Sequence, residues 1–230
     1  MLTSGTKQNL SLRIWIKLLL AITCLLSATL LQAQDARWAF RGGIMAFRGE
    51  TTELGGLMEE PGIDFSMLGS LPFENARWRG YIELAYGQSP AERDVSENEL
   101  GTSIYRTTSR HLFAGVGIKH IFNSNLNRYV PYQGMFNPYV AANVGAVRYR
   151  NTSNFELLDI EGFEIVEEPR WSLGVQGEAG AEILLDENWY LLAFGTLRYG
   201  FDDGWDGLDF NSLNDDWVVR LGLGFGYLFD

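Results

Sequence analysis

A serine and a histidine lie two positions apart in the chain, at Ser109 and His111. In an extended segment such residues share a face, so the pair offers a nucleophile and a base of the kind that cleaves esters. Two such residues are about 6.5 Å apart along a strand, and nothing in the sequence identifies a third, orienting group. We therefore predict no catalytic site.

The segment 201–215 is rich in aspartate. Its candidate oxygen ligands are Asp202, Asp203, Asp206 and Asp209, with glycines between them. Ca²⁺ prefers such oxygens, but the segment lacks the ligand spacing and the terminal glutamate of an EF-hand loop. We predict a solvated acidic loop that binds divalent cations weakly and collectively, with no defined metal site. The sequence also contains no nucleotide motif, so we expect no cofactor.

The last strand-like segment, 217–229, has two unlike faces. One face is apolar and aromatic throughout, from Trp217 to Phe229 at alternate positions. The other carries three glycines and Arg220, which would make a poor surface in water. Small inward residues with an occasional charge suit the crowded interior of a narrow β-barrel whose outer face meets lipid.

Alternation with a period of two predicts eight strands along the chain. Most reach the roughly 9–11 residues that a tilted membrane strand needs. The predicted strands cover 36–48, 62–71, 78–87, 105–122, 138–150, 170–185, 189–200 and 216–229. The fold class is therefore all-β: an eight-stranded antiparallel up-and-down transmembrane β-barrel.

The connections between these strands differ in length and charge. The odd-numbered connections, 49–61, 88–104, 151–169 and 201–215, are long, and they hold 19 of the 29 acidic residues and one basic residue. Outer-membrane barrels keep their longer loops on the extracellular side, which fits an N-terminus in the periplasm. The even-numbered connection 123–137 is the exception to this scheme, and we expect a small insertion that packs beneath the barrel.

Tryptophans are placed at the ends of the predicted strands. Trp38, Trp78 and Trp189 begin upward strands, whereas Trp171 and Trp217 begin downward ones. An indole ring at a membrane interface buries its ring and keeps its N–H in water, so these positions predict two aromatic belts.

The N-terminus has the pattern of a secretory signal. Three basic residues precede an apolar stretch, 18–31, that leads to a small residue at Ala33. The stretch is shorter than the roughly 20 residues of a membrane-spanning helix, and Cys24 lies inside it, which disfavours a retained anchor and a lipoprotein signal. We predict a cleaved signal at 1–33 and one barrel domain at 34–230.

Four charged residues share the inward-facing parity of the last three strands: Glu178, Glu182, Arg198 and Arg220. The pairing of the last two strands would bring Arg220 near Thr196 and Arg198, with Glu178 on the next strand. Because the interior of an eight-stranded barrel is filled by side chains, we expect a cluster that neutralises its own charge. A gated polar pathway is the alternative.

The chain resembles the eight-stranded outer-membrane barrels of Gram-negative bacteria, the group of OmpA-like and OmpX-like proteins. Beyond the architecture, it ends Gly224-Phe225-Gly226-Tyr227-Leu228-Phe229, with aromatic residues at alternate positions. This ending resembles the C-terminal signal read by the barrel-assembly machinery, with Gly224, Tyr227 and Phe229 as its assembly-signal residues. Asp230 follows the phenylalanine and departs from that pattern.

A narrower resemblance concerns barrels associated with type IX secretion and gliding. It is carried by Leu197-Arg198-Tyr199-Gly200-Phe201 and by Asp216-Trp217 at the start of the last strand. It implies a scaffold that contacts periplasmic partners, for which the 123–137 insertion is the candidate surface.

The predicted function is that of a non-enzymatic structural or interaction protein of the cell outer membrane, with acidic extracellular loops. A secretion- or gliding-associated scaffold and a narrow, porin-like channel are the alternatives. Outer-membrane lipids, lipopolysaccharide, the assembly machinery and an envelope or secretion protein are the expected partners. A formal net charge of −11 argues against nucleic acid. We expect His111 to be an interfacial residue.

Overall fold

A computed structural model describes most of the predicted barrel domain. The described residues are 36–48, 61–73, 77–98, 101–122, 136–157, 160–166, 168–201 and 217–229. The predicted signal at 1–33, most of the predicted insertion (123–135) and the aspartate-rich residues 202–215 lie outside these ranges.

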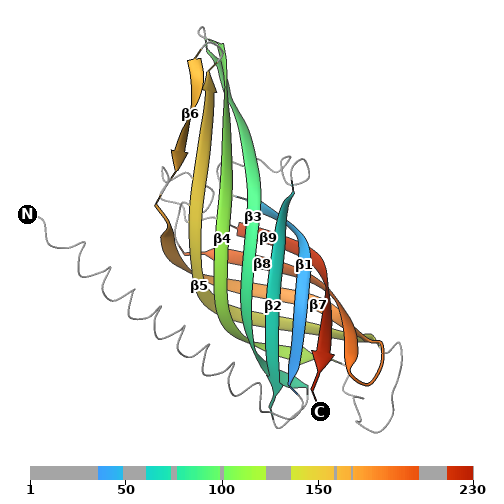
Figure 1. The fold of residues 1–230 in the computed structure, drawn as a ribbon. Helices are drawn as coiled ribbons and strands as arrows, with labels where there is room; N and C mark the ends of the chain where they lie inside the picture. Colours follow the sequence, from blue (N-terminus) through green and yellow to red (C-terminus); the bar gives the residue numbers. More distant parts are fainter. Residues whose placement is uncertain are drawn as a thin grey trace, which may run out of the picture.

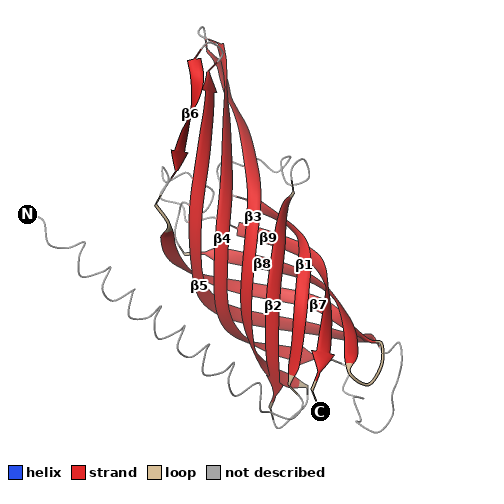
Figure 2. Ribbon diagram, in the orientation of Figure 1, coloured by secondary structure: helices blue, strands red, loops and turns tan. Residues whose placement is uncertain are grey.

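The described elements are β-strands (Figure 2). They are β1 (Arg37–Arg48), β2 (Gly62–Pro72), β3 (Trp78–Asn98), β4 (Gly101–Ile121), β5 (Phe136–Leu157), β6 (Ile160–Val166), β7 (Arg170–Leu184), β8 (Trp189–Gly200) and β9 (Trp217–Leu228). Among the described residues, no helix has the length and apolar character needed to cross a membrane.

Eight of these strands close into an antiparallel barrel (Figure 1). Each of β1 to β5 pairs with the next, β5 pairs with β7, and β7 pairs with β8 and β8 with β9. The first and last strands close the ring, from Arg37 opposite Leu228 to Arg48 opposite Trp217. The prediction of an eight-stranded antiparallel barrel is confirmed.

The two ends of the barrel differ. The start of β1 and the end of β9 lie at one end, where only residues 185–188 connect β7 to β8. Barrels of the outer-membrane type place their short turns on the periplasmic side, so we name this the inner end. At the opposite, outer end, residues 49–61 connect β1 to β2 and residues 201–216 connect β8 to β9. The inner end also carries one long connection, 122–135, between β4 and β5.

The outer surface of the barrel is apolar. Phe40 (66% exposed), Phe65 (59%) and Leu223 (71%) are examples of large hydrophobic side chains that point away from the interior. Such side chains occur around the barrel, on strands that bury the residues of opposite parity. A continuous apolar exterior of this kind is stable against hydrocarbon, not water.

The glycines of β9 leave room for side chains that cross the interior. A Cβ atom on Gly226 would lie 2.2 Å from the Tyr190 ring, and one on Gly224 would lie 2.8 Å from the Arg41 side chain. On Gly222 it would lie 2.7 Å from the Phe194 ring. The small inward face predicted for this strand therefore accommodates large residues from β1 and β8.

The predicted strand lengths were wrong for three strands. β3 continues to Asn98, β4 begins at Gly101, and β5 continues to Leu157, where the prediction placed the loops 88–104 and 151–169. A ninth strand, β6, lies within the second of these loops. Alternation is weak in these segments because neither face of a strand outside the membrane has to be apolar.

Candidate functional site

The barrel interior contains a band of charged and polar side chains. Arg41, at its centre, binds carboxylates from two other strands: its Nη1 donates to both carboxylate oxygens of Glu178 at 2.8 Å, and its Nη2 donates to Glu83 at 2.6 Å. Its Nε donates to Ser66 at 3.0 Å. One guanidinium from β1 thereby joins β2, β3 and β7 across the interior.

Glu83 is shared by two arginines of this band, Arg41 and Arg220. Its Oε1 accepts from Arg41 and, at 2.9 Å, from Arg220. Its Oε2 accepts from Asn143 at 2.9 Å and from Gln176 at 2.8 Å. Glu83 is 1% exposed, so these four bonds replace the water that an ionised carboxylate requires.

Arg220 and Arg198 extend the band toward the outer end. Arg220 forms an ion pair with Asp64 and donates to Ser66 at 3.1 Å. Arg198 donates to Gln176 Oε1 at 2.7 Å and 3.0 Å, and its guanidinium lies 3.8 Å from the centre of the Phe113 ring. An amide oxygen and an aromatic face therefore solvate Arg198.

A second charged group lies nearer the inner end. Glu182 forms ion pairs with Arg37, at 2.6 Å, and with Lys119. The Lys119 ammonium lies 3.7 Å from the centre of the Tyr139 ring. The Tyr139 hydroxyl donates to Glu178 at 2.8 Å, which links this group to the band around Arg41.

The four interior residues predicted from the sequence are all buried inside the barrel. Thr196 is opposite Arg220 and Glu178 is opposite Thr196, as the pairing predicted. The predicted self-neutralising cluster is wrong in one respect, because the carboxylates and Arg220 form their ion pairs with residues of β1 to β4. Those partners, which the sequence reasoning missed, are Arg37, Arg41, Asp64, Glu83 and Lys119.

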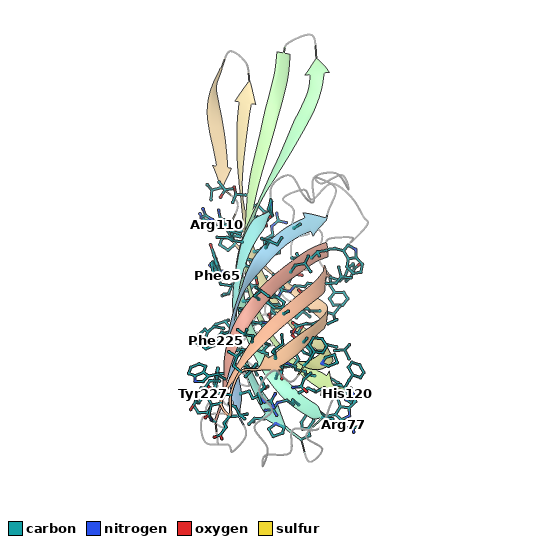
Figure 3. The ribbon with its side chains drawn as sticks, turned by 90° about the vertical axis from the view of Figure 1, so that its right-hand side faces the viewer. Phe65, Arg77, Arg110, His120, Phe225 and Tyr227 are labelled. Carbon is teal, nitrogen blue, oxygen red and sulfur yellow. The ribbon has the colours of Figure 1, made fainter. Side chains whose placement is uncertain are left out.

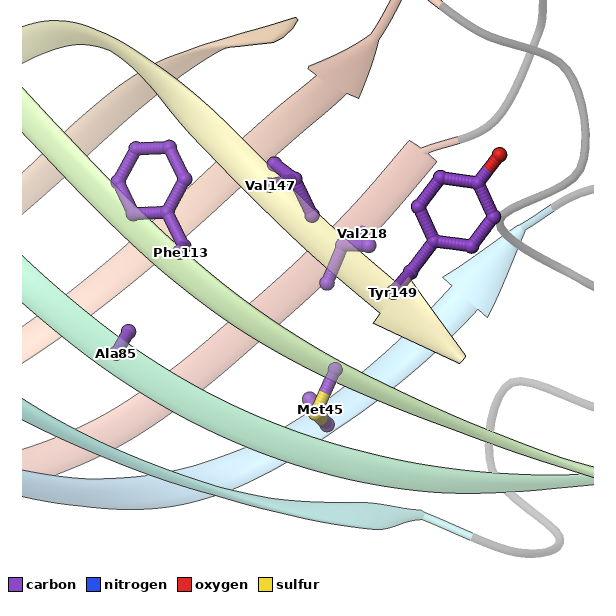
Figure 4. Packing of buried hydrophobic residues seen from close by; sticks show 6 residues of the cluster. All are labelled: Met45, Ala85, Phe113, Val147, Tyr149 and Val218. Carbon is purple, nitrogen blue, oxygen red and sulfur yellow. The ribbon is translucent and has the colours of Figure 1, made fainter. Parts of the chain in front are cut away.

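Clusters of apolar side chains alternate with the charged groups along the interior. Toward the outer end, Figure 4 shows the cluster formed by Met45, Ala85, Phe113, Val147, Tyr149 and Val218. Toward the inner end, a second cluster contains Ala39, Leu68, Tyr81, Tyr190 and Leu192. The inward residues of β1 show the alternation: Arg37 is charged, Ala39 is apolar, Arg41 is charged and Met45 is apolar. These layers fill the interior.

Ser109 and His111 lie on the interior face of β4, both 3% exposed. The expectation that His111 is interfacial is wrong, because its parity is that of the inward residues Phe113 and Lys119. The outward histidine is His120, whose ring centre lies 4.4 Å from that of Trp78 and 5.1 Å from that of Phe122. Within the described ranges, no group of three histidine, cysteine or acidic residues could hold a metal ion.

The predicted assembly-signal residues lie at the inner end of β9. Tyr227 is part of an outward aromatic group in which its ring centre lies 4.7 Å from that of Trp189 and 4.9 Å from that of Phe229. Gly224 has inward parity and lies beside Arg41. Figure 3 labels Tyr227 and Phe225 on the same side of the barrel. Recognition by the assembly machinery stays a prediction.

A four-stranded sheet projects from the outer end (Figure 1). The pairing of β3 with β2 ends at Gln88, and that of β5 with β7 ends at Tyr149. Beyond these residues β3, β4 and β5 stay paired with one another, and β6 adds to β5. We call residues 89–98, 101–109, 150–157 and 160–166 the projecting sheet.

One of the comparisons with solved structures supports the architecture. A major outer membrane protein from Thermus thermophilus matches with a TM-score of 0.51 at 16% identity, over 85% of this chain and all of that one. Neisserial surface protein A gives a TM-score of 0.49 at 13% identity, over 84% of this chain and 97% of that one. Ail, the attachment invasion locus protein of Yersinia pestis, gives 0.45 at 15% identity, over 86% of this chain and all of that one.

No protein-family model matches the sequence, and no curated protein matches it. The likeness is therefore one of fold. The closed ring of eight antiparallel strands and the apolar exterior agree with that likeness. The chain has the fold of the eight-stranded outer-membrane β-barrels, and in that fold it resembles the OmpA-like and OmpX-like group.

Proposed function

We propose that this barrel is a cell-surface interaction protein that uses the projecting sheet to bind partners outside the membrane. One observation carries the proposal: β3, β4 and β5 continue beyond the barrel as paired strands. A strand advances about 3.3 Å per residue, so the ten residues of β3 after Gln88 hold the sheet about 30 Å beyond its last contact with β2.

The charge of the projecting segments favours a cationic partner. The projecting sheet contains six acidic residues, Glu92, Asp94, Glu97, Glu156, Glu161 and Glu164, and three basic ones, Arg93, Arg106 and Arg150. Opposite charge increases the rate of encounter and disfavours anionic partners.

The two outer strands of the projecting sheet differ in their capacity to accept another strand. Both edges have a shift in register, β3 with β4 between Val95 and Glu97 and β6 with β5 between Phe155 and Leu157. The difference is Pro90 in β3, which has no N–H to donate. Proline and bulges are features that protect sheet edges from further pairing. β6 contains no proline, so β6 is the proposed edge for an extended cationic segment.

The layered interior supports an interaction role over transport. Two apolar clusters and the charged band fill the space that a channel would need. The narrow channel and the periplasmic scaffold remain alternative predictions. An ion current that changes on Glu178→Gln or Arg220→Gln would favour the channel, and copurification with secretion components that depends on residues 123–137 would favour the scaffold.

The test removes the projecting sheet and keeps the barrel. Pro90 is opposite Thr108, and Thr152 is opposite Val166, so an Asn-Gly turn can replace 91–107 and another can replace 153–165.

The probe is a peptide of alternating lysine and threonine. The control peptide is N-methylated at alternate residues, so it cannot add to the sheet as a strand.

We expect the first peptide to bind the intact barrel and to lose roughly tenfold or more in affinity for the doubly shortened variant, about 1.4 kcal/mol. Shortening only 91–107 should leave most of the binding if β6 is the edge. Equal binding to the doubly shortened variant, with the barrel folded, would contradict the proposed function.

A further inference from the structure

Three arginines lie on the outward face of β4 and β5 at the outer end of the barrel. Arg110, Arg148 and Arg150 are exposed, and their neighbours along the strands, such as His111 and Tyr149, point into the interior. Figure 3 shows Arg110 near the base of the projecting sheet, on the side of the barrel that bears Phe65.

The register places two of these arginines directly opposite each other. Arg110 of β4 is paired with Arg150 of β5, and Arg148 lies two residues before Arg150 on the same face. Side chains opposite each other in an antiparallel sheet have Cβ atoms about 4.5–5.5 Å apart, and like charges there destabilise the pair. An anion bound between the two guanidinium groups would turn this repulsion into a net attraction.

The interior ion pairs described above do not supply that anion. Their carboxylates, Asp64, Glu83, Glu178 and Glu182, are all inside the barrel. Arg148 instead lies over an aromatic ring, with its guanidinium 6.0 Å from the ring centre of Trp171.

The level of the arginines along the barrel indicates where their ligand comes from. Outward positions of β5 from Phe136 to Ala146 are occupied by apolar residues and one proline, and Arg148 is the next outward residue. This length matches the roughly 9–11 residues that a tilted strand needs to cross the hydrocarbon. The arginines therefore lie at the level of the lipid head groups of the outer leaflet, with Trp171 as an interfacial aromatic beside them.

We propose that Arg110, Arg148 and Arg150 form a binding site for the phosphate groups of a phosphorylated glycolipid of the outer leaflet. A guanidinium group donates two parallel hydrogen bonds to a phosphate, and the opposed pair Arg110 and Arg150 can hold one phosphate from two sides. The acyl chains of the same lipid would lie along the apolar side chains below, including Leu112 and Val144. This site is separate from the proposed edge of the projecting sheet and does not depend on it.

The experiment measures lipid binding to the folded full-length chain in detergent. The probes are lipid A with both phosphates, the same lipid with both phosphates removed, and inorganic phosphate. The variants are R110Q/R150Q, which removes the opposed charges, and R110K/R150K, which keeps the charge but not the paired hydrogen bonds. Arg77→Gln is the matched control, because Arg77 is an exposed arginine at the inner end.

We expect R110Q/R150Q to weaken binding of the phosphorylated lipid roughly tenfold or more, because charge-assisted hydrogen bonds are lost. R110K/R150K should lie between this variant and the unaltered chain, and Arg77→Gln should bind as the unaltered chain does. Equal binding of the dephosphorylated lipid, or unchanged binding by R110Q/R150Q, would overturn the proposal. Competition by inorganic phosphate at equal concentration would overturn it too, because the site would then be one for a free anion.

Thermal unfolding separates a binding role from a structural one. Without the lipid, Arg110→Gln should raise the unfolding temperature, since it removes a repulsion between like charges. With the phosphorylated lipid, the same change should lower that temperature, since a ligand that binds the folded state stabilises it. A change of the same sign in both conditions would contradict the site.

Discussion

Glu83 is the residue on which the interior charges depend most. Its carboxylate accepts hydrogen bonds from Arg41, Arg220, Asn143 and Gln176, each from a different strand. The apolar exterior gives little driving force for closing the ring, because its side chains face hydrocarbon whether the strands are paired in the closed barrel or not. The specific contacts inside the barrel therefore carry much of the information that sets which strands are neighbours.

Glu83→Gln keeps the shape of the side chain and removes its charge, so Arg41 and Arg220 each lose one of two carboxylate partners. Breaking a buried ion pair on one side costs about 3–5 kcal/mol, and we expect a loss of folding free energy in this range. The measurement is urea unfolding in detergent, followed by the heat-dependent migration of the folded barrel on a gel. Glu187→Gln, at an exposed turn residue, should change the free energy by less than about 0.5 kcal/mol. A loss for Glu83→Gln no larger than this control would contradict the role of the shared carboxylate.

Strands β7 and β9 were predictable from the sequence because lipid on one side and a crowded interior on the other impose opposite demands on alternate residues. The inward face of β9 holds Arg220 and three glycines, and its outward face holds large apolar side chains. The projecting parts of β3 to β6 lie beyond the barrel, where no face has to meet lipid. Their sequences therefore show no alternation of apolar and polar residues from which the strands could be predicted. The ion-pair partners on β1 and β2 were missed because apolar residues occur on their inward faces too, Ala39 and Met45 in β1 and Leu68 in β2, which made the parity of these strands ambiguous.

Substitution by alanine should change the stability of the barrel in opposite directions at two of its glycines, Gly226 and Gly177. A methyl group on Gly226 would lie 2.2 Å from the Tyr190 ring, whereas one on Gly177 would meet nothing within 4 Å. Gly226→Ala should therefore destabilise the barrel by about 1–3 kcal/mol through overpacking. Gly177→Ala should stabilise it by about 0.4–1 kcal/mol, because alanine restricts the unfolded chain.

Combining Gly226→Ala with Tyr190→Leu should recover part of the loss, since the two residues share one space. The double-mutant cycle is measured by urea unfolding in detergent. Additive effects of the two changes would show that the close approach of Gly226 to Tyr190 does not limit the packing.

The whole molecule combines a closed barrel with an extended surface structure. Its interior alternates charged and apolar layers, and its exterior carries apolar side chains up to the level of Arg148. Above that level, β3, β4, β5 and β6 continue as the projecting sheet beyond the ring. Interaction sites are therefore expected at the outer end and at the head-group level, and transport through the interior is not.

The closed interior predicts that the barrel, reconstituted in a planar bilayer, carries no steady unit current. Charged and apolar layers alternate along it, so opening one of them should not create a pore. Phe113→Ala combined with Met45→Ala removes two large apolar contributors to the outer cluster, yet it leaves the ion pairs of Glu83 with Arg41 and Arg220 in place. This variant should also stay closed, because the inner cluster that contains Tyr81, Tyr190 and Leu192 stays in place as well. A steady current through the unaltered barrel, sensitive to Arg220→Gln, would contradict the closed interior and favour a channel.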